Sequence, residues 1–173
     1  MAVRIMPASL SRGFYFRTLT RILGEPRRFF CELGPETRML SPLMFLMVSS
    51  VLSAAGAMAG TGSRSLITGG ILFVNSVGMV FVASGIGYLI LTPVAARRIP
   101  YQRFFAVYAF SAGVTLLASW LPFFTCLTEP WKWWLIGTGM IHSLGLTRTQ
   151  ALVVIGLSIS ILILFFGSLL PLI

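Results

Sequence analysis

Charged residues are scarce in this chain. Only 10% of its 173 residues are charged, and the acidic residues number four, all of them glutamate. Soluble domains carry charge on about a quarter of their residues, so this composition excludes an ordinary water-soluble domain. The hydrophobic fraction of 57% instead predicts an integral membrane protein that forms one compact unit.

Histidine and cysteine are nearly absent too, with one histidine and two cysteines. Cys31 and Cys126 lie far apart, on opposite sides of the predicted membrane domain, so we expect no disulfide between them. Neither residue type shows the spacing of a metal site. A catalytic triad cannot be assembled from one histidine without acids in the membrane, and no phosphate-binding loop is present. We predict no enzymatic activity, no cofactor and no metal.

Arginine, in contrast, is abundant, supplying 12 of the 13 basic residues and most of the net charge of +9. In a membrane protein such an excess indicates orientation and contact with anionic lipid, so we expect no nucleic-acid partner. Seven arginines fall within residues 1–38, which we predict to be a cytoplasmic, basic, amphipathic segment.

Residues 9–23 of this segment predict an amphipathic helix. Its apolar side would hold Tyr15, Phe16, Leu19, Ile22 and Leu23, opposite Arg17 and Arg21, and Gly24-Glu25-Pro26 would end it. Such a helix suits the plane of the membrane surface, and docking to a partner protein is the alternative. The residues expected to contact lipid or a partner are Arg17, Arg21, Arg27, Arg28, Phe14, Phe16, Phe29 and Phe30.

The arginine pair before two phenylalanines superficially resembles a twin-arginine export signal. Glu32, Glu36 and Arg38 separate this pair from the following apolar run. We therefore expect no cleaved signal.

Residues 39–173 predict a membrane domain of five helices and no strand. The expected spans are about 39–61, 67–92, 104–122, 130–147 and 150–171. The fourth is the shortest, and Lys132 would have to reach the interface for it to cross. If it is re-entrant instead, four spans remain and the C-terminus changes sides.

The basic residues predict the orientation. With the N-terminus inside, 11 of the 13 lie on the inner side, as the positive-inside rule requires. All four tryptophans, Trp120, Trp131, Trp133 and Trp134, would then lie at the outer interface, which amphipathic rings prefer. The expected architecture is N-in and C-out, in a bacterial inner membrane.

Several motifs follow one another in a recognisable order. They are Pro-x-x-Phe-Phe (26–30), Ser-Pro-Leu (41–43), a basic and aromatic loop (97–105), Trp-Leu-Pro (120–122) and His-Ser-Leu-Gly-Leu-Thr-x-x-Gln-Ala (142–151). In this order the chain resembles the Yip family, the Ypt/Rab-GTPase-interacting membrane domain, in its bacterial branch. The resemblance covers roughly residues 19–170 and implies a five-span protein without catalytic residues. The long acidic and aromatic region tied to GTPase binding in eukaryotic members has no counterpart here, so a GTPase partner is not carried over.

Polar side chains within the spans offer a second type of site. Asn75 and Ser76 would hydrogen-bond across helices, and His142 would bond to a backbone carbonyl or a lipid phosphate. As a haem ligand, His142 would need a methionine or a partner's histidine as second ligand. The competing interpretation is a polar cavity between the second and fourth spans, lined by Asn75, Ser76, Thr138 and His142.

Small residues recur at spacings that allow close helix packing, for example Gly139-x-x-x-Ser143 and Gly156-x-x-x-Ser160. We expect most to pack the bundle itself and one or two to face a partner. The function expected is a non-enzymatic membrane scaffold or an accessory subunit of a larger assembly, such as a respiratory or photosynthetic complex. Its partners would be anionic lipids and other membrane subunits. The alternative is a small transporter or lipid-handling protein that uses the polar cavity.

Overall fold

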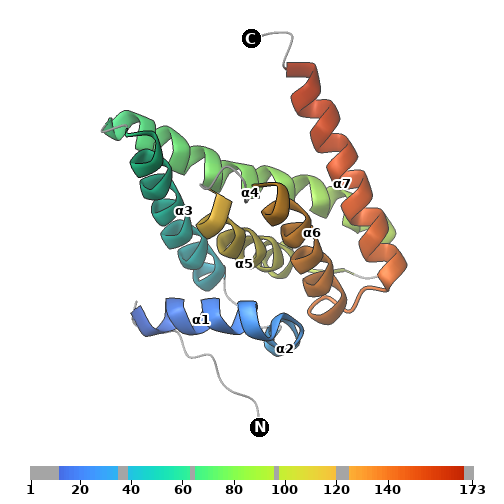
Figure 1. The fold of residues 1–173 in the computed structure, drawn as a ribbon. Coiled ribbons are helices and arrows are strands. Elements are labelled where there is room, and N and C mark those ends of the chain that lie inside the picture. The colour runs from blue at the N-terminus through green and yellow to red at the C-terminus, as the bar shows by residue number, and fades with distance from the viewer. Residues whose placement is uncertain (1–11, 35–38, 63–64, 96–97, 120–124, 170–173) are drawn as a thin grey trace.

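The computed structural model describes residues 12–34, 39–62, 65–95, 98–119 and 125–169, and in these residues the chain is helical without a strand (Figure 1). The helices are α1 (Arg12–Gly24), α2 (Pro26–Glu32), α3 (Leu40–Thr61), α4 (Leu66–Val94), α5 (Tyr101–Ser119), α6 (Thr125–His142) and α7 (Arg148–Leu169). The expectation of an all-helical protein is confirmed.

Helix α5 lies at the centre of the bundle. Twelve consecutive residues, from Phe104 to Thr115, are buried. A helix that is apolar all round belongs inside a protein, and α5 is packed against α1, α3, α4 and α6. These four helices therefore surround it, and α7 packs outside them on α4 and α6.

Glycines bring the surrounding helices close to α5. A Cβ atom added to Gly87 of α4 would lie 2.6 Å from the Tyr108 hydroxyl, and one added to Gly139 of α6 would lie 2.5 Å from Cγ1 of Val107. On α5 itself, a Cβ at Gly113 would lie 2.7 Å from the Phe45 ring of α3. Each contact requires hydrogen in place of a side chain, as small residues at membrane helix interfaces allow.

Within the part of the chain that the structure describes, three helices are long and apolar enough to cross a membrane: α3, α4 and α7. At about 1.5 Å per residue, the 29 residues of α4 extend for roughly 44 Å, which exceeds a hydrocarbon core of about 30 Å. A span of this length is accommodated by tilting, by kinking or by local thickening of the bilayer. In Figure 1, α4 crosses the bundle obliquely, whereas α7 rises steeply and extends past its neighbours.

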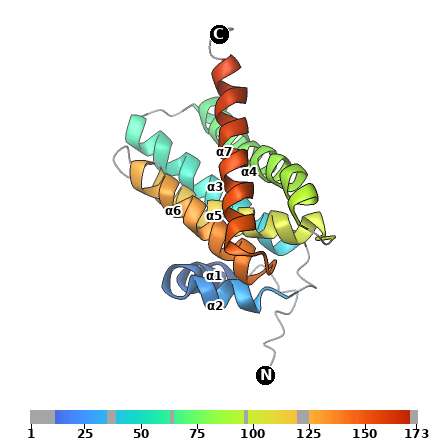
Figure 2. The ribbon, with the colours of Figure 1, turned by 90° about the vertical axis from the view of Figure 1, so that its right-hand side faces the viewer.

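Helices α1 and α2 lie across one end of the bundle (Figure 2). It is the end at which α7 begins, opposite the end reached by Leu169, and we call it the basic end. Pro26 is the first residue of α2, where the missing N–H costs no hydrogen bond. Gly24, Glu25 and Pro26 thus end the first helix, as the sequence predicted, and Pro26 also starts a second helix that was not predicted.

The helix boundaries agree closely with the expected spans for α3, α4 and α7, and differ for α5 and α6. We expected α6 to begin near residue 130, but it begins at Thr125 and contains Pro130. Pro93 lies inside α4, one residue before its end. Helix α6 stops at His142, because Gly145 then adopts a left-handed conformation with φ 62°.

Candidate interface at the basic end

The apolar face of α1 packs on the bundle of its own chain. Ile22 is fully buried, the Tyr15 ring stacks on Phe45 with centroids 4.9 Å apart, and the Tyr15 hydroxyl lies 3.0 Å from Oγ of Ser49. Burial raises the pKa of Tyr15, although the hydrogen bond to Ser49 opposes the shift. The sequence assigned this face to lipid or a partner protein. That is wrong for Tyr15 and Ile22, while Phe16 and Leu23 remain exposed.

Helix α2 is held more firmly still. Phe30 is fully buried against Gly139 of α6, and Phe29, 8% exposed, packs edge-on to Phe110 of α5. We expected both rings to anchor in the headgroup layer, and burial excludes this. The two rings, one residue apart, pack on two different helices and leave no apolar face for lipid. Phe16 is 62% exposed and Phe14 is half-buried, so a headgroup contact stays a prediction for these two.

The arginines of α1 and α2 fall into two groups. Arg21 pairs with Glu32 at 3.3 Å, and Arg28 pairs with both Glu25 and Glu32 at 3.2 and 3.3 Å. Among the described residues, the exposed Arg17 and Arg27 have no ion pair. Exposed pairs of this kind contribute about 0–1 kcal/mol. They fix side-chain positions more than they add stability, and they leave two cations free.

A hollow of about 450 Å³ separates the α1–α2 turn from α6. Its lining includes Arg27, Arg28 and Trp134, so the structure brings together residues that we expected on opposite sides of the membrane. The reason is the earlier start of α6. Trp131, Trp133 and Trp134 lie in the middle of this helix, not at its beginning. Trp134 therefore lies beside Arg27 and Arg28 and not at the opposite end of the bundle from them.

The remaining tryptophan contacts are local to α6. The rings of Trp131 and Trp134, both exposed, lie 5.3 Å apart, and Lys132 lies 5.5 Å from the ring of the half-buried Trp133. Lys132 also pairs with Glu129 at 2.7 Å. The fourth tryptophan, Trp120, is outside the described residues.

Two hydrogen-bonded links join helices at or near the basic end. Thr147 and Gln150 form a reciprocal capping box at the start of α7, with bonds of 3.0 and 3.2 Å. Nε2 of Gln150 also donates to the Val94 carbonyl at the end of α4, at 3.2 Å. Separately, Nη2 of Arg103 donates to the Ser143 carbonyl at 2.6 Å, which joins the start of α5 to the end of α6.

We did not predict these links. The Thr-x-x-Gln spacing was visible within the motif at 142–151, and a capping box is its ordinary meaning. The partners of Arg103 and Gln150, 40 and 56 residues away, had no local signal.

The four polar residues expected to line a cavity between the second and fourth spans lie on two different helices, two on α4 and two on α6. Asn75 is exposed on α4, and the Ser76 hydroxyl donates to the Leu72 carbonyl one turn earlier. On α6, Nδ1 of the exposed His142 lies 2.9 Å from the carbonyl of the buried Thr138, a backbone contact that we had expected for this histidine. None of these four residues lines the hollow at the α1–α2 turn or a second hollow at the end of α4.

Within the described residues, no group of three or more histidine, cysteine or acidic side chains is placed to hold a metal ion. Comparison with models of protein families, with curated proteins and with solved structures gives no significant match. The residues themselves therefore carry the functional argument.

Proposed function

We propose that the protein is a non-enzymatic membrane scaffold, an accessory subunit that presents a fixed basic surface to anionic lipids and to an acidic segment of a partner. One observation carries this proposal. Helices α1 and α2 are held on the bundle by Ile22, Phe29 and Phe30, while Arg17 and Arg27 remain exposed and unpaired within the described residues. A rigid support for free cations favours binding, because no segment has to be ordered first.

The proposal includes five membrane spans with the basic end inside. Helices α3, α4 and α7 have the length and apolarity of spans. Helix α5 is included as a span that its neighbours and not lipid surround, because it is buried from Phe104 to Thr115. The arginines of α1 and α2 support an inner position for this end.

Membership of the bacterial Yip branch is part of the same proposal. It depends on the order of the motifs, and the last motif corresponds to a defined structure, the turn at Gly145 followed by the capping box of α7. Other chains of the branch should carry the same turn and cap if the resemblance is real.

The decisive experiment is a purification in mild detergent from the native membrane, with mass spectrometry of the proteins that accompany the chain. We expect stoichiometric partner subunits with the wild type. The double variant Arg17→Glu/Arg27→Glu should lose them, because it reverses both free cations.

The matched control is Arg148→Glu, which reverses an exposed arginine at the start of α7, outside the α1–α2 surface. It should retain the partners. Recovery of the wild type alone, with lipid only, would reject the accessory-subunit role. Equal losses in the control would show a general charge effect.

A further inference from the structure

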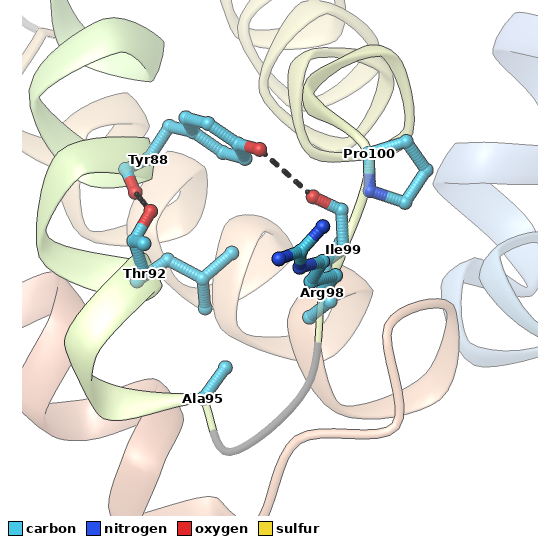
Figure 3. Close-up of a pocket in the computed structure, with 7 residues that line it drawn as sticks. Tyr88, Thr92, Ala95, Arg98, Ile99 and Pro100 are labelled. Carbon is cyan, nitrogen blue, oxygen red and sulfur yellow. Dashed lines mark hydrogen bonds between the residues drawn. The ribbon is translucent and has the colours of Figure 1, made fainter.

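A second pocket, of about 780 Å³, lies where α4 ends and the chain turns toward α5 (Figure 3). It is separate from the surface of α1 and α2. Its lining consists of Tyr88, Leu91, Thr92, Ala95, Arg98, Ile99 and Pro100. Sites for small molecules have volumes of about 300–1,000 Å³, so the space suits part of an amphiphile.

Among the described residues that line this pocket, Arg98 alone offers side-chain donors that are not already engaged. The Tyr88 hydroxyl donates to the Ile99 carbonyl at 3.0 Å, and Oγ1 of Thr92 donates to the Tyr88 carbonyl at 3.0 Å. Both hydroxyl protons are thus engaged. The exposed Arg98 has no hydrogen-bond or ionic partner among the described residues, and its guanidinium points toward α4 in Figure 3.

No acidic side chain is among the described residues that line the pocket, so none of them neutralises the charge of Arg98. A guanidinium binds phosphate oxygens through paired N–H groups, and these charge-assisted bonds are the strongest that a side chain offers. The polar side of the pocket therefore selects an anion.

The other side of the pocket is apolar. Leu91 is 1% exposed, and Ala95 and Ile99 are also buried, so their side chains form a closed floor. Farther along α4, Val82 and Leu89 are exposed, as on a surface that faces acyl chains. A free phosphate ion would leave this apolar floor unused, whereas a lipid would use both sides.

We propose that this pocket binds one anionic phospholipid of the inner leaflet, with its phosphate on Arg98 and the start of an acyl chain over Leu91, Ala95 and Ile99. The proposal rests on the membrane orientation proposed above. It does not require the accessory-subunit role. The site differs from the α1–α2 surface because it holds a single molecule in a defined position.

Native mass spectrometry of the detergent-purified chain tests this site. Phosphatidylglycerol and phosphatidylcholine are titrated separately, and the bound fraction is measured. We expect one phosphatidylglycerol molecule to bind in preference to phosphatidylcholine. Arg98→Ala should weaken this binding about fivefold, the factor expected for one basic side chain beside an anionic lipid.

Arg148→Ala is the matched control, because it removes an exposed arginine outside the pocket, and it should bind as the wild type does. Thr92→Trp adds bulk from an exposed position and should block binding without removing charge. Inorganic phosphate at millimolar concentration should not compete.

Equal binding of both lipids, wild-type affinity in Arg98→Ala, or displacement by phosphate alone would overturn the proposal. The partner purification is an independent readout. Arg98→Ala should still recover the partner subunits, so failure of the lipid site and failure of the scaffold role can be told apart.

Discussion

Gly139 is the position at which a single methyl group should have the clearest effect. Its added Cβ would lie 2.5 Å from Val107 and 3.1 Å from Phe30, within a contact among α2, α5 and α6. We expect Gly139→Ala to lower the free energy of unfolding by about 1–3 kcal/mol through overpacking. Unfolding of the purified protein by heat or SDS in detergent measures this loss.

Gly156→Ala is the control for this substitution. It adds the same methyl group to a helical glycine that has no atom within 4 Å of the new Cβ. Alanine is the better helix former by roughly 0.5–1 kcal/mol, so the control should be neutral or stabilising. Equal destabilisation in both variants would contradict the packing argument.

Gln150 combines two roles that different substitutions separate. Gln150→Ala removes both the capping bond to Thr147 and the bond to the Val94 carbonyl. We expect a loss of about 1–2 kcal/mol, because two hydrogen bonds worth about 0.5–1.5 kcal/mol each are removed. Gln150→Glu keeps an acceptor for the cap but loses the amide donor, so it should cost less in the same unfolding measurement.

Thr149→Ala changes an exposed residue between the two capping positions and should be silent. A loss in Thr149→Ala as large as that in Gln150→Ala would show that the start of α7 is sensitive to any change.

Among the elements, the α1–α2 pair depends on a few rings for its attachment. Truncating the fully buried Phe30 to alanine should cost about 3–5 kcal/mol. Because the Phe30 ring attaches α2 to α6, its loss should loosen α1 and α2 from the bundle and expose their arginines to trypsin. In Phe30→Ala we expect limited trypsin digestion to cleave faster at Arg17, Arg21, Arg27 and Arg28. Mass spectrometry of the fragments identifies the cleaved sites.

Phe16→Ala removes the same ring from an exposed position of α1 and should be cleaved at the wild-type rate. Rapid cleavage of the wild type itself would show that α1 and α2 are not firmly packed.

The sequence predicted α3, α4 and α7 well because long uncharged runs identify a helix almost alone. The runs predicted at 39–61 and 67–92 differ from α3 and α4 by at most two residues at either end. Helix α6 was harder. Glu129 and Pro130 together suggested a boundary, but Glu129 pairs with Lys132 one turn later and the helix passes through the proline.

The candidate interface was predicted only in part. Composition and periodicity identified a basic helix with an apolar face, but they could not tell what covers that face. Phe29 and Phe30 follow two arginines, which is typical of a headgroup anchor. Their actual partners, Phe110 and Gly139, lie more than 75 residues away and left no local pattern.

At the scale of the whole molecule, Cys31 provides a test of orientation. Its side chain is exposed on α2, so it lies at the basic end. In a Cys126→Ser background Cys31 is the only cysteine. We expect a membrane-impermeant maleimide to label it in inverted vesicles and not in intact cells.

Ser65→Cys, in a chain with both native cysteines replaced by serine, is the complementary variant. Ser65 is exposed just before α4, at the turn from α3, which should face the outside. One proposed span, α3, lies between Cys31 and Ser65, so the two positions should be labelled from opposite sides. Labelling of both from the same side would contradict a membrane crossing by α3. Labelling of Cys31 in intact cells would reverse the proposed orientation.

The central position of α5 also bears on how the chain is made. Helix α5 carries Arg103 in its first turn and the polar Ser111 and Thr115 in its buried part. During synthesis it emerges after α3 and α4, which already offer part of its surroundings, and before α6 and α7. We therefore expect the insertion machinery to release α5 into the bilayer poorly by itself and efficiently once its neighbours are present. The helix that holds the finished bundle together would be the one most dependent on the others for entry.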